Sequence, residues 1–254
     1  MTEIGLLSTV EQIALVRSGD LSSRELTEHF IKRIERLDPE INAVVTRDFE
    51  VALEQADVAD EQGQKGKLIG ALHGIPITVK DALETRNLRS TGGAIELQDN
   101  VPDRDAAVVA SLRREGAIVM GKTNLPRWSG DIQSYNEIFG TTNNPWNLSC
   151  GPGGSSGGAA AAVAMGFTSF EIGTDIGGSI RFPAAFNGIW GHKPSFGVIP
   201  TTGYLDHTQG GLNEADINVF GPLARSATDL GFLLDIMKRN SPPWIPQLLE
   251  APPD

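Results

Sequence analysis

The chain has 254 residues, of which 40% are hydrophobic and 6% aromatic, and this composition predicts a globular protein with a substantial buried core. Its 21 basic and 32 acidic residues give a formal net charge of −11, which argues against binding of nucleic acid or an anionic membrane through overall charge. Cys150 is the only cysteine, so an intramolecular disulfide and a cysteine-based zinc site are excluded, and we expect a small buried thiol.

The N-terminal region, residues 1–64, is expected to form a layer of helices. Two segments have the S/T-x-x-E form of a capping box at a helix start: Ser8 with Glu11, and Ser22 with Glu25. After the second box, apolar residues recur at helical spacing, and we expect Pro39 to end that helix. A third helix is expected over residues 50–62.

The following region, residues 68–240, alternates helices and strands. The sequence HGIPITVKD at residues 73–81 predicts a short strand with Lys80 at its end, where a lysine is usually solvated. Residues 105–115 predict a helix and residues 117–120 a buried strand. This alternation indicates an α/β sandwich.

Two glycine turns that present serines dominate the second half of the chain. Residues 122–151 predict a long irregular loop, and such loops are uncommon unless they are functional. GGSSGG follows at residues 153–158, and GGS at residues 177–179. Because glycine lets a ligand approach the main chain closely, these turns predict a functional site. A helix is expected over residues 226–238. The five prolines of residues 241–254 predict a connector.

Several motifs together resemble one protein family. The chain contains, in order, SSRELTEHFIKRIERLDPEINAV, HGIPITVKD, GGSSGG, GTDIGGSIRFPAAFNGIWGHKPS and GPLARSATDL. This series resembles the amidase signature family of serine hydrolases over nearly the whole chain. The resemblance implies the amidase signature fold, an α/β/α sandwich in which helices flank a central mixed β-sheet, with residues 1–254 as one such domain.

The resemblance also implies a Ser–cis-Ser–Lys triad. Its nucleophile is Ser179, its bridging serine is Ser155 and its base is Lys80, with a cis peptide bond between Gly154 and Ser155. A serine hydroxyl needs a base to remove its proton, and a lysine serves only when it is uncharged. The pKa of Lys80 must therefore fall from about 10.4 towards 7–8, through burial and neighbouring dipoles.

Further positions follow from the same resemblance. It assigns the backbone donors of an oxyanion hole to Ile176, Gly177 and Gly178. It also gives supporting roles to Ser156, Asp175 and Arg181. From the residues alone, a structural ion pair or hydrogen bonds that brace a loop are the favoured interpretation of Asp175 and Arg181. Spacing alone also leaves a Ser-His-Asp triad open, because triads are assembled in space.

The sequence departs from the family in two respects. Family members are close to twice as long, so we expect a C-terminally truncated fold whose open sheet edge favours association, including a homo-oligomer. Phe182 stands where the amidotransferase subunit of this family usually carries Gln, and this residue favours a stand-alone amidase.

The sequence therefore predicts an amidase that hydrolyses a small-molecule amide through an acyl-enzyme on Ser179, without a metal or organic cofactor. Three alternatives remain: an esterase or aryl-acylamidase with the same triad, an inactive scaffold or a chain completed by a partner, and an amidotransferase subunit. The first residues lack a signal peptide, and no apolar run reaches the about 18 residues of a membrane span. We expect a cytoplasmic chain that binds no nucleic acid.

Overall fold

The computed structural model describes residues 3–238, so the connector expected at residues 241–254 lies outside the described residues. The helices are α1 (Thr9–Ser18), α2 (Ser23–Ile41), α3 (Phe49–Gln64), α4 (Ala107–Arg114), α5 (Gly157–Ala164), α6 (Arg181–Asn187) and α7 (Ala227–Met237). The strands are β1 (Val44–Arg47), β2 (Ile75–Lys80), β3 (Ala117–Thr123), β4 (Tyr135–Asn136), β5 (Gly140–Thr141), β6 (Glu171–Asp175), β7 (Trp190–Gly191) and β8 (Val219–Ala224). Short 3-10 turns cover Ile4–Leu6, Ile95–Leu97 and Arg127–Ser129.

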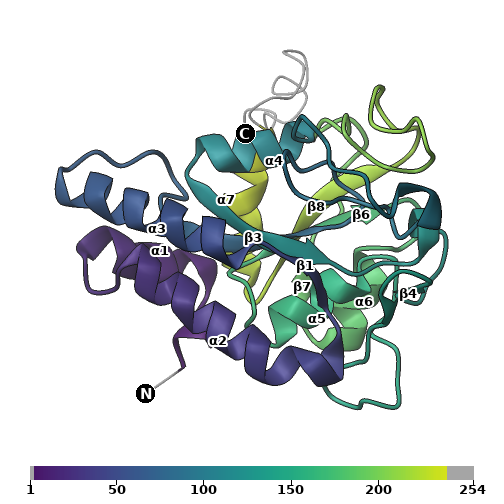
Figure 1. The fold of residues 1–254 in the computed structure, drawn as a ribbon, viewed down its shortest axis with the longest axis horizontal. Coiled ribbons are helices and arrows are strands. Elements are labelled where there is room, and N and C mark those ends of the chain that lie inside the picture. Colours follow the sequence, from purple (N-terminus) through teal and green to yellow (C-terminus); the bar gives the residue numbers. More distant parts are fainter. Residues whose placement is uncertain (1–2, 239–254) are drawn as a thin grey trace, which may run out of the picture.

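Two three-stranded sheets lie side by side across the middle of the molecule (Figure 1). In the first, of order β1-β3-β2, β2 runs parallel to β3 and β1 runs antiparallel to it. The second, of order β6-β8-β7, is antiparallel. They meet beside β2, where Ser169 N donates to Pro76 O at 3.4 Å and Thr78 N to Thr168 Oγ1 at 2.9 Å. The expected mixed sheet is thus confirmed, as two units joined at β2.

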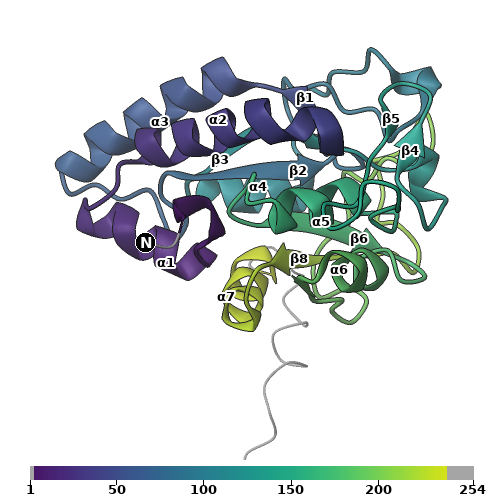
Figure 2. The same cartoon turned by 90° about the horizontal axis from the view of Figure 1, so that it is seen from below.

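The helices lie on both sides of β2 and β3. Figure 2 shows α2 and α3 together on one side of these strands, and α5 on the other side. Helix α5 consists only of small residues and Val163, and its first two glycines are closely surrounded. A Cβ atom on Gly157 would lie 2.3 Å from Ser134 Oγ, and one on Gly158 would lie 2.4 Å from Asn124 N. The small residues therefore let α5 approach the loop that follows β3.

Both predicted capping boxes are present at the starts of α1 and α2. The prediction that α2 ends at Pro39 is wrong, because the helix continues to Ile41. A proline lacks only its own N–H, so near the end of a helix the loss is a single backbone hydrogen bond. Asn42, in the left-handed conformation with φ 57°, then ends the helix and donates its N–H to Asp38 O.

Two further expectations need correction. The region 1–64, expected as a layer of helices, also supplies the four-residue strand β1, which pairs with β3 through Val44, Thr46 and Arg47. So short a strand has too little alternation to be read from the sequence. Cys150 is exposed rather than buried, because it lies in a turn where its N–H donates to Asn147 O.

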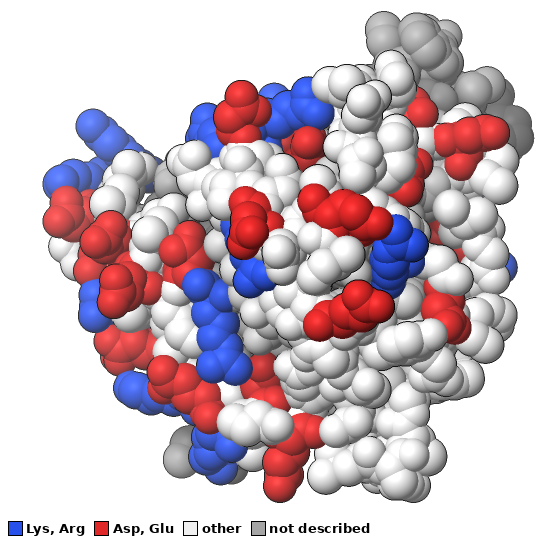
Figure 3. Space-filling model, turned by 45° about the vertical axis from the view of Figure 1, so that its right-hand side comes forward, with Lys and Arg blue, Asp and Glu red and all other residues white. Residues whose placement is uncertain are grey.

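Acidic and basic side chains are interspersed on the face shown in Figure 3, without a cluster of Lys and Arg there. Within residues 3–238, no helix has the length and apolar composition needed to cross a membrane. The same part of the chain has no group of three or more His, Cys, Asp or Glu residues placed to hold a metal ion.

Candidate active site

Lys80 is the centre of a buried polar cluster. Its side chain, at the end of β2, has no exposure to solvent, in contrast to the usual lysine at a strand end. The Nζ atom donates to Ser155 Oγ at 2.7 Å, to Thr174 Oγ1 at 2.7 Å and to Ser156 Oγ at 3.1 Å. Three neutral hydroxyl groups thus hold the amine, and no carboxylate among residues 3–238 forms an ion pair with it.

Burial lowers the pKa of Lys80 from its ordinary value to about 7, because the charged form loses its water. The negative charges of Glu171 and Asp175 oppose this effect. An amine with this pKa is present in large part as the free base near neutral pH. The condition for a lysine to act as a general base is therefore met by the environment that the fold provides.

The two serines that contact Lys80 lie at the start of α5. The peptide bond between Gly154 and Ser155 is cis. Ser156 Oγ accepts the N–H of Thr174 at 3.2 Å, which ties the start of α5 to β6. A Cβ atom on Gly154 would lie 2.6 Å from Gln133 N, so the backbone passes too close to the preceding loop for a larger residue.

Ser179 lies in the turn between β6 and α6, next to this cluster. Its side chain is half-buried, and its carbonyl oxygen accepts the N–H of Ser156 at 3.2 Å. Its hydroxyl makes no hydrogen bond to any of residues 3–238, so it is available for another partner. The structure therefore brings Lys80, Ser155 and Ser156 into direct contact and places Ser179 beside them, without a hydrogen bond between the hydroxyls of Ser155 and Ser179.

Asp175 organises the turn that carries Ser179. Its carboxylate accepts the N–H groups of Gly178 at 2.7 Å and of Ile180 at 3.0 Å. Arg181 adds two side-chain hydrogen bonds at 3.0 Å each. Burial alone would raise the pKa of Asp175, but these hydrogen bonds outweigh it and hold the pKa below its ordinary value. The structural alternative left open by the sequence, an ion pair with loop-bracing hydrogen bonds, is what the structure contains.

The same turn determines which backbone N–H groups are free. That of Gly178 is already donated to Asp175. Those of Ile176, Gly177 and Ser179 make no hydrogen bond within the described part of the chain. Gly178 has φ 122°, and a Cβ atom there would lie 2.3 Å from the ring of Phe182. Glycine is therefore required at 178 by both conformation and space.

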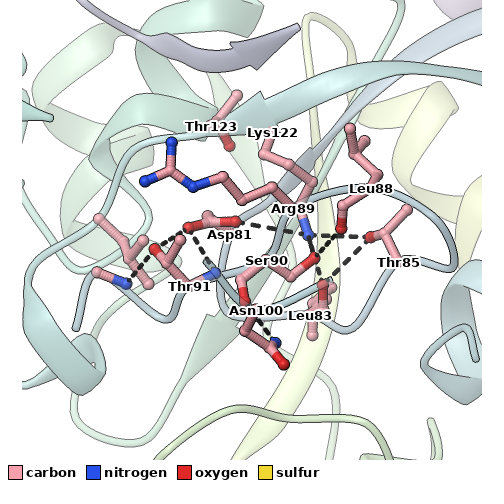
Figure 4. Close-up of polar contacts among 12 residues, drawn as sticks. Asp81, Leu83, Thr85, Leu88, Arg89, Ser90, Thr91, Asn100, Lys122 and Thr123 are labelled. Carbon is pink, nitrogen blue, oxygen red and sulfur yellow. Dashed lines mark hydrogen bonds and ion pairs between the residues drawn. The ribbon is translucent and has the colours of Figure 1, made fainter. Parts of the chain in front are cut away.

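A second buried lysine was not singled out by the sequence. Lys122, expected at the start of a loop, belongs to β3, and it has no solvent exposure. Figure 4 shows its amine among Leu83 O, Thr85 Oγ1, Ser90 Oγ and the Asp81 carboxylate, which lies 3.8 Å away. Burial lowers the pKa of Lys122 to about 8. This lysine joins the segment after β2 to β3, and only its contacts, which are distant in sequence, reveal it.

The histidines take no part in the cluster. His29 accepts the N–H of Gly5, and His73 that of Ile69. Within residues 3–238, no histidine side chain hydrogen-bonds to a serine of the site. The described geometry thus offers no Ser-His-Asp arrangement.

Comparisons with known proteins identify the family and the fold of the chain. The chain matches the family described as Amidase over residues 25–253, and it therefore belongs to this family. Its fold is the amidase signature fold. A crystal structure of an amidase has a TM-score of 0.84 and 34% identity, covering 93% of this chain and 53% of that one. The peptide amidase of Stenotrophomonas maltophilia has a TM-score of 0.83 and 34% identity, covering 96% of this chain and 50% of that one.

The curated relatives are named as amidotransferase subunits rather than as amidases. A glutamyl-tRNA(Gln) amidotransferase subunit of Acinetobacter baumannii is 40% identical over 93% of this chain and 47% of its own length. The protein of the same name from Chromohalobacter salexigens is also 40% identical, over 89% of this chain and 45% of its own length. The chain spans about half the length of the curated relatives it matches.

Proposed function

We propose that this chain carries the reacting centre of an amidase that converts a carboxylic amide to an acid and an amine or ammonia. The observation that carries the proposal is the fully buried Lys80 amine, hydrogen-bonded at 2.7 Å to Ser155 and with its pKa lowered to about 7. Lys80 is the base, Ser155 relays the proton and Ser179 is the nucleophile.

In the proposed reaction, Ser179 Oγ attacks the amide carbonyl carbon and gives its proton to Ser155, whose own proton passes to Lys80. The C–N bond of the tetrahedral intermediate then breaks, and the leaving nitrogen takes the proton from Lys80 through Ser155. A water molecule attacks the acyl-enzyme by the same route, which releases the acid and restores the Ser179 hydroxyl.

The oxyanion of that intermediate needs donors at the Ser179 turn. The N–H groups of Ile176 and Gly177 fit this role because no described residue uses them. The predicted third donor, Gly178, is held by Asp175, and Ser179 N–H takes its place in this proposal. Each such donor contributes about 3–4 kcal/mol of transition-state stabilisation in serine hydrolases.

A second candidate, the amidotransferase subunit, is supported by the 40% identity to curated relatives of that name. Phe182 argues for a stand-alone enzyme, as does the similarity to a bacterial aryl acylamidase with a TM-score of 0.84 and 34% identity. The similarity to that acylamidase also supports the alternative of an aryl-acylamidase or esterase activity. A panel of amides, anilides and esters separates these hydrolases, and copurification with further subunits identifies the amidotransferase.

Completion by a partner, including a second copy, is the remaining alternative. Large apolar side chains on or next to α6 are about half-exposed: Ile176, Phe182, Phe186 and Trp190. Exposed apolar groups of this size beside a site are typical of surfaces that other protein segments cover. The measured oligomeric state at two protein concentrations tests association of copies.

Labelling with a fluorophosphonate serine probe tests the proposal. We expect the wild-type chain to be labelled, the Ser179→Ala variant to be unlabelled and the Lys80→Ala variant to be labelled more slowly. Circular dichroism shows whether each variant is folded. A folded wild-type chain that is not labelled would contradict activity of this chain by itself.

A further inference from the structure

The loop that follows β3, residues 124–151, contributes no group to the proposed reaction. A connection of this length is uncommon in a compact domain unless it has a function. The loop packs against the turn of residues 153–157, which carries the relay hydroxyl of Ser155, and this contact shows what the loop can do for the site.

Ser134 joins the loop to this turn through its hydroxyl group. The side chain is buried, with 1% exposure. Its Oγ atom donates to the carbonyl oxygens of Gly153, at 3.1 Å, and of Ser155, at 3.4 Å. The same atom accepts the N–H of Gly157 at 3.0 Å. One hydroxyl group thus binds the main chain before, at and after Ser155.

The turn has little conformational preference of its own. Gly153, Gly154 and Gly157 are glycines, and Gly153 has φ 79°. Because glycine adopts many backbone conformations, contacts with other segments must select the one that the site needs. Among residues 3–238, the hydrogen bond from Ser134 is the only one that the main chain of Ser155 makes.

The next residue of the turn has anchors on another side. Ser156 donates its N–H to Ser179 O at 3.2 Å, and its Oγ accepts the N–H of Thr174 at 3.2 Å. These bonds join the turn to β6 and to the nucleophile turn, whereas Ser134 joins it to the loop. Ser134 is therefore the direct anchor of the Ser155 main chain.

The position of Ser155 matters because its Oγ lies 2.7 Å from the Lys80 amine and must also be reached by the proton of Ser179. A misplacement of about 1 Å in such a group can slow a reaction about 10²-fold. Together with the proposed role of Ser155 as relay, on which this inference rests, we propose that Ser134 is a positioning residue for Ser155. Its hydroxyl fixes the turn so that the relay hydroxyl stays at hydrogen-bond distance from the amine.

Thr142 offers a matched control in the same loop. Its side chain is also buried, and its hydroxyl donates to a backbone carbonyl, Asn42 O, at 2.7 Å. It accepts an N–H from the side chain of Asn124 at 3.0 Å. Thr142→Val therefore removes the same kinds of hydrogen bond from the loop, but none that reaches the turn of residues 153–157.

The first measurement uses the whole chain labelled with ¹³C-lysine. The Cε chemical shift of Lys80, assigned by its loss in Lys80→Met, is followed by NMR against pH. Ser155→Ala removes an acceptor that favours the ammonium, so the Lys80 midpoint should fall. Ser134→Ala should lower the midpoint by about 0.3 pH unit or more, with no further fall when it is added to Ser155→Ala. Thr142→Val should leave the midpoint in place. An unchanged midpoint in folded Ser134→Ala overturns the proposal.

The second measurement is the rate of fluorophosphonate labelling of folded protein. We expect Ser134→Ala to slow labelling about 10–10²-fold in the wild-type background. In the Ser155→Ala background the relay that Ser134 positions is absent, so the same change should slow labelling less than about twofold. A residue that only stabilises the fold would slow both backgrounds by the same factor, and that result contradicts a role through Ser155.

Ser134→Cys covers the case in which Ser134→Ala does not fold. A thiol is a weaker donor and acceptor than a hydroxyl, so we expect changes of the same sign but smaller size. A midpoint and a labelling rate at their wild-type values would overturn the proposal in this variant. The NMR midpoints are read without any turnover. A folded wild-type chain that is not labelled therefore contradicts the proposed function, while the midpoints still decide the role of Ser134.

Discussion

The amine of Lys80 donates a 2.7 Å hydrogen bond to the hydroxyl of Ser155, and both side chains are completely buried. Removal from water lowers the pKa of the amine to about 7, so the burial that penalises an ammonium ion in the core also creates a base for neutral pH. The hydroxyl groups around the amine compensate part of its lost solvation without adding a countercharge that would restore the proton.

Replacing Ser155 distinguishes a relay from a mere hydrogen-bond partner. Ser155→Ala removes the proposed path between Ser179 and Lys80, so we expect the second-order rate of fluorophosphonate labelling to fall about 10²–10⁴-fold. Thr174→Val removes another hydroxyl at the same 2.7 Å distance from the amine, but not the relay, and we expect a fall of about tenfold or less. Equal losses in the two variants would contradict the relay.

Replacing Asp175 tests how the nucleophile turn is held. Its carboxylate accepts backbone N–H groups from Gly178 and Ile180 in addition to the Arg181 side chain. Asp175→Asn turns one acceptor into a donor that faces these groups, so we expect the free energy of unfolding in urea to fall by about 2–3 kcal/mol. Arg181→Met removes only the half-exposed ion pair and should cost about 1 kcal/mol or less. A larger loss in Arg181→Met than in Asp175→Asn would show that the ion pair, rather than the backbone bonds, holds the turn.

The sequence predicted those parts of the molecule whose signal is local. Both capping boxes, most helices and the serine turns follow from residues a few positions apart, and the family motifs pointed to Lys80, Ser155 and Ser179. The burial of Lys80 could not be read in this way, because its hydroxyl partners lie 75 to 94 positions away in the chain.

The same limit explains what the sequence missed. Glu171 and Lys122 look like ordinary charged residues at strand ends until the fold buries them. The Gly178 N–H is donated to Asp175 and is therefore not free for an oxyanion. This hydrogen bond depends on the conformation of one turn, which glycine allows but does not determine. Pro39 inside α2 shows the opposite error, in which a local rule applied too strictly ended a helix two residues early.

Adjacent glycines in the nucleophile turn differ sharply in what they tolerate. At Gly177 an added Cβ meets no atom within 4 Å, so we expect Gly177→Ala to change the free energy of unfolding by about 0.5 kcal/mol or less. At Gly178 the left-handed φ and the Phe182 ring oppose a side chain, so Gly178→Ala should lose about 2–4 kcal/mol. The double variant Gly178→Ala/Phe182→Ala should lose less than the sum of its parts, because the clash is gone and only the backbone strain remains. Strict additivity would contradict a clash with Phe182.

The lowered pKa of Lys80 also predicts a pH dependence of stability with a definite sign. In the folded chain Lys80 releases its proton near pH 7, whereas in the unfolded chain it does so near its ordinary value of about 10.4. Between these values the unfolded state binds more protons, so the contribution of Lys80 to the free energy of unfolding rises with pH, by at most about 1.4 kcal/mol per unit. Below pH 7 both states hold the proton, and this contribution no longer changes.

Lys80→Met separates this effect from titrations that are not coupled to Lys80, while the coupled Glu171 carboxyl, whose pKa burial raises to about 7, also contributes to the difference. Lys122, whose pKa is lowered to about 8, acts in the same direction but is present in both proteins, so its contribution cancels in the difference. Urea unfolding of wild type and variant at half-unit steps from about pH 6 to about pH 9.5 should give a wild-type minus variant difference that is flat at first and then climbs. A difference that stays flat throughout would mean that folded Lys80 keeps an ordinary pKa and remains an ammonium ion at neutral pH, which would remove the base from the proposed reaction.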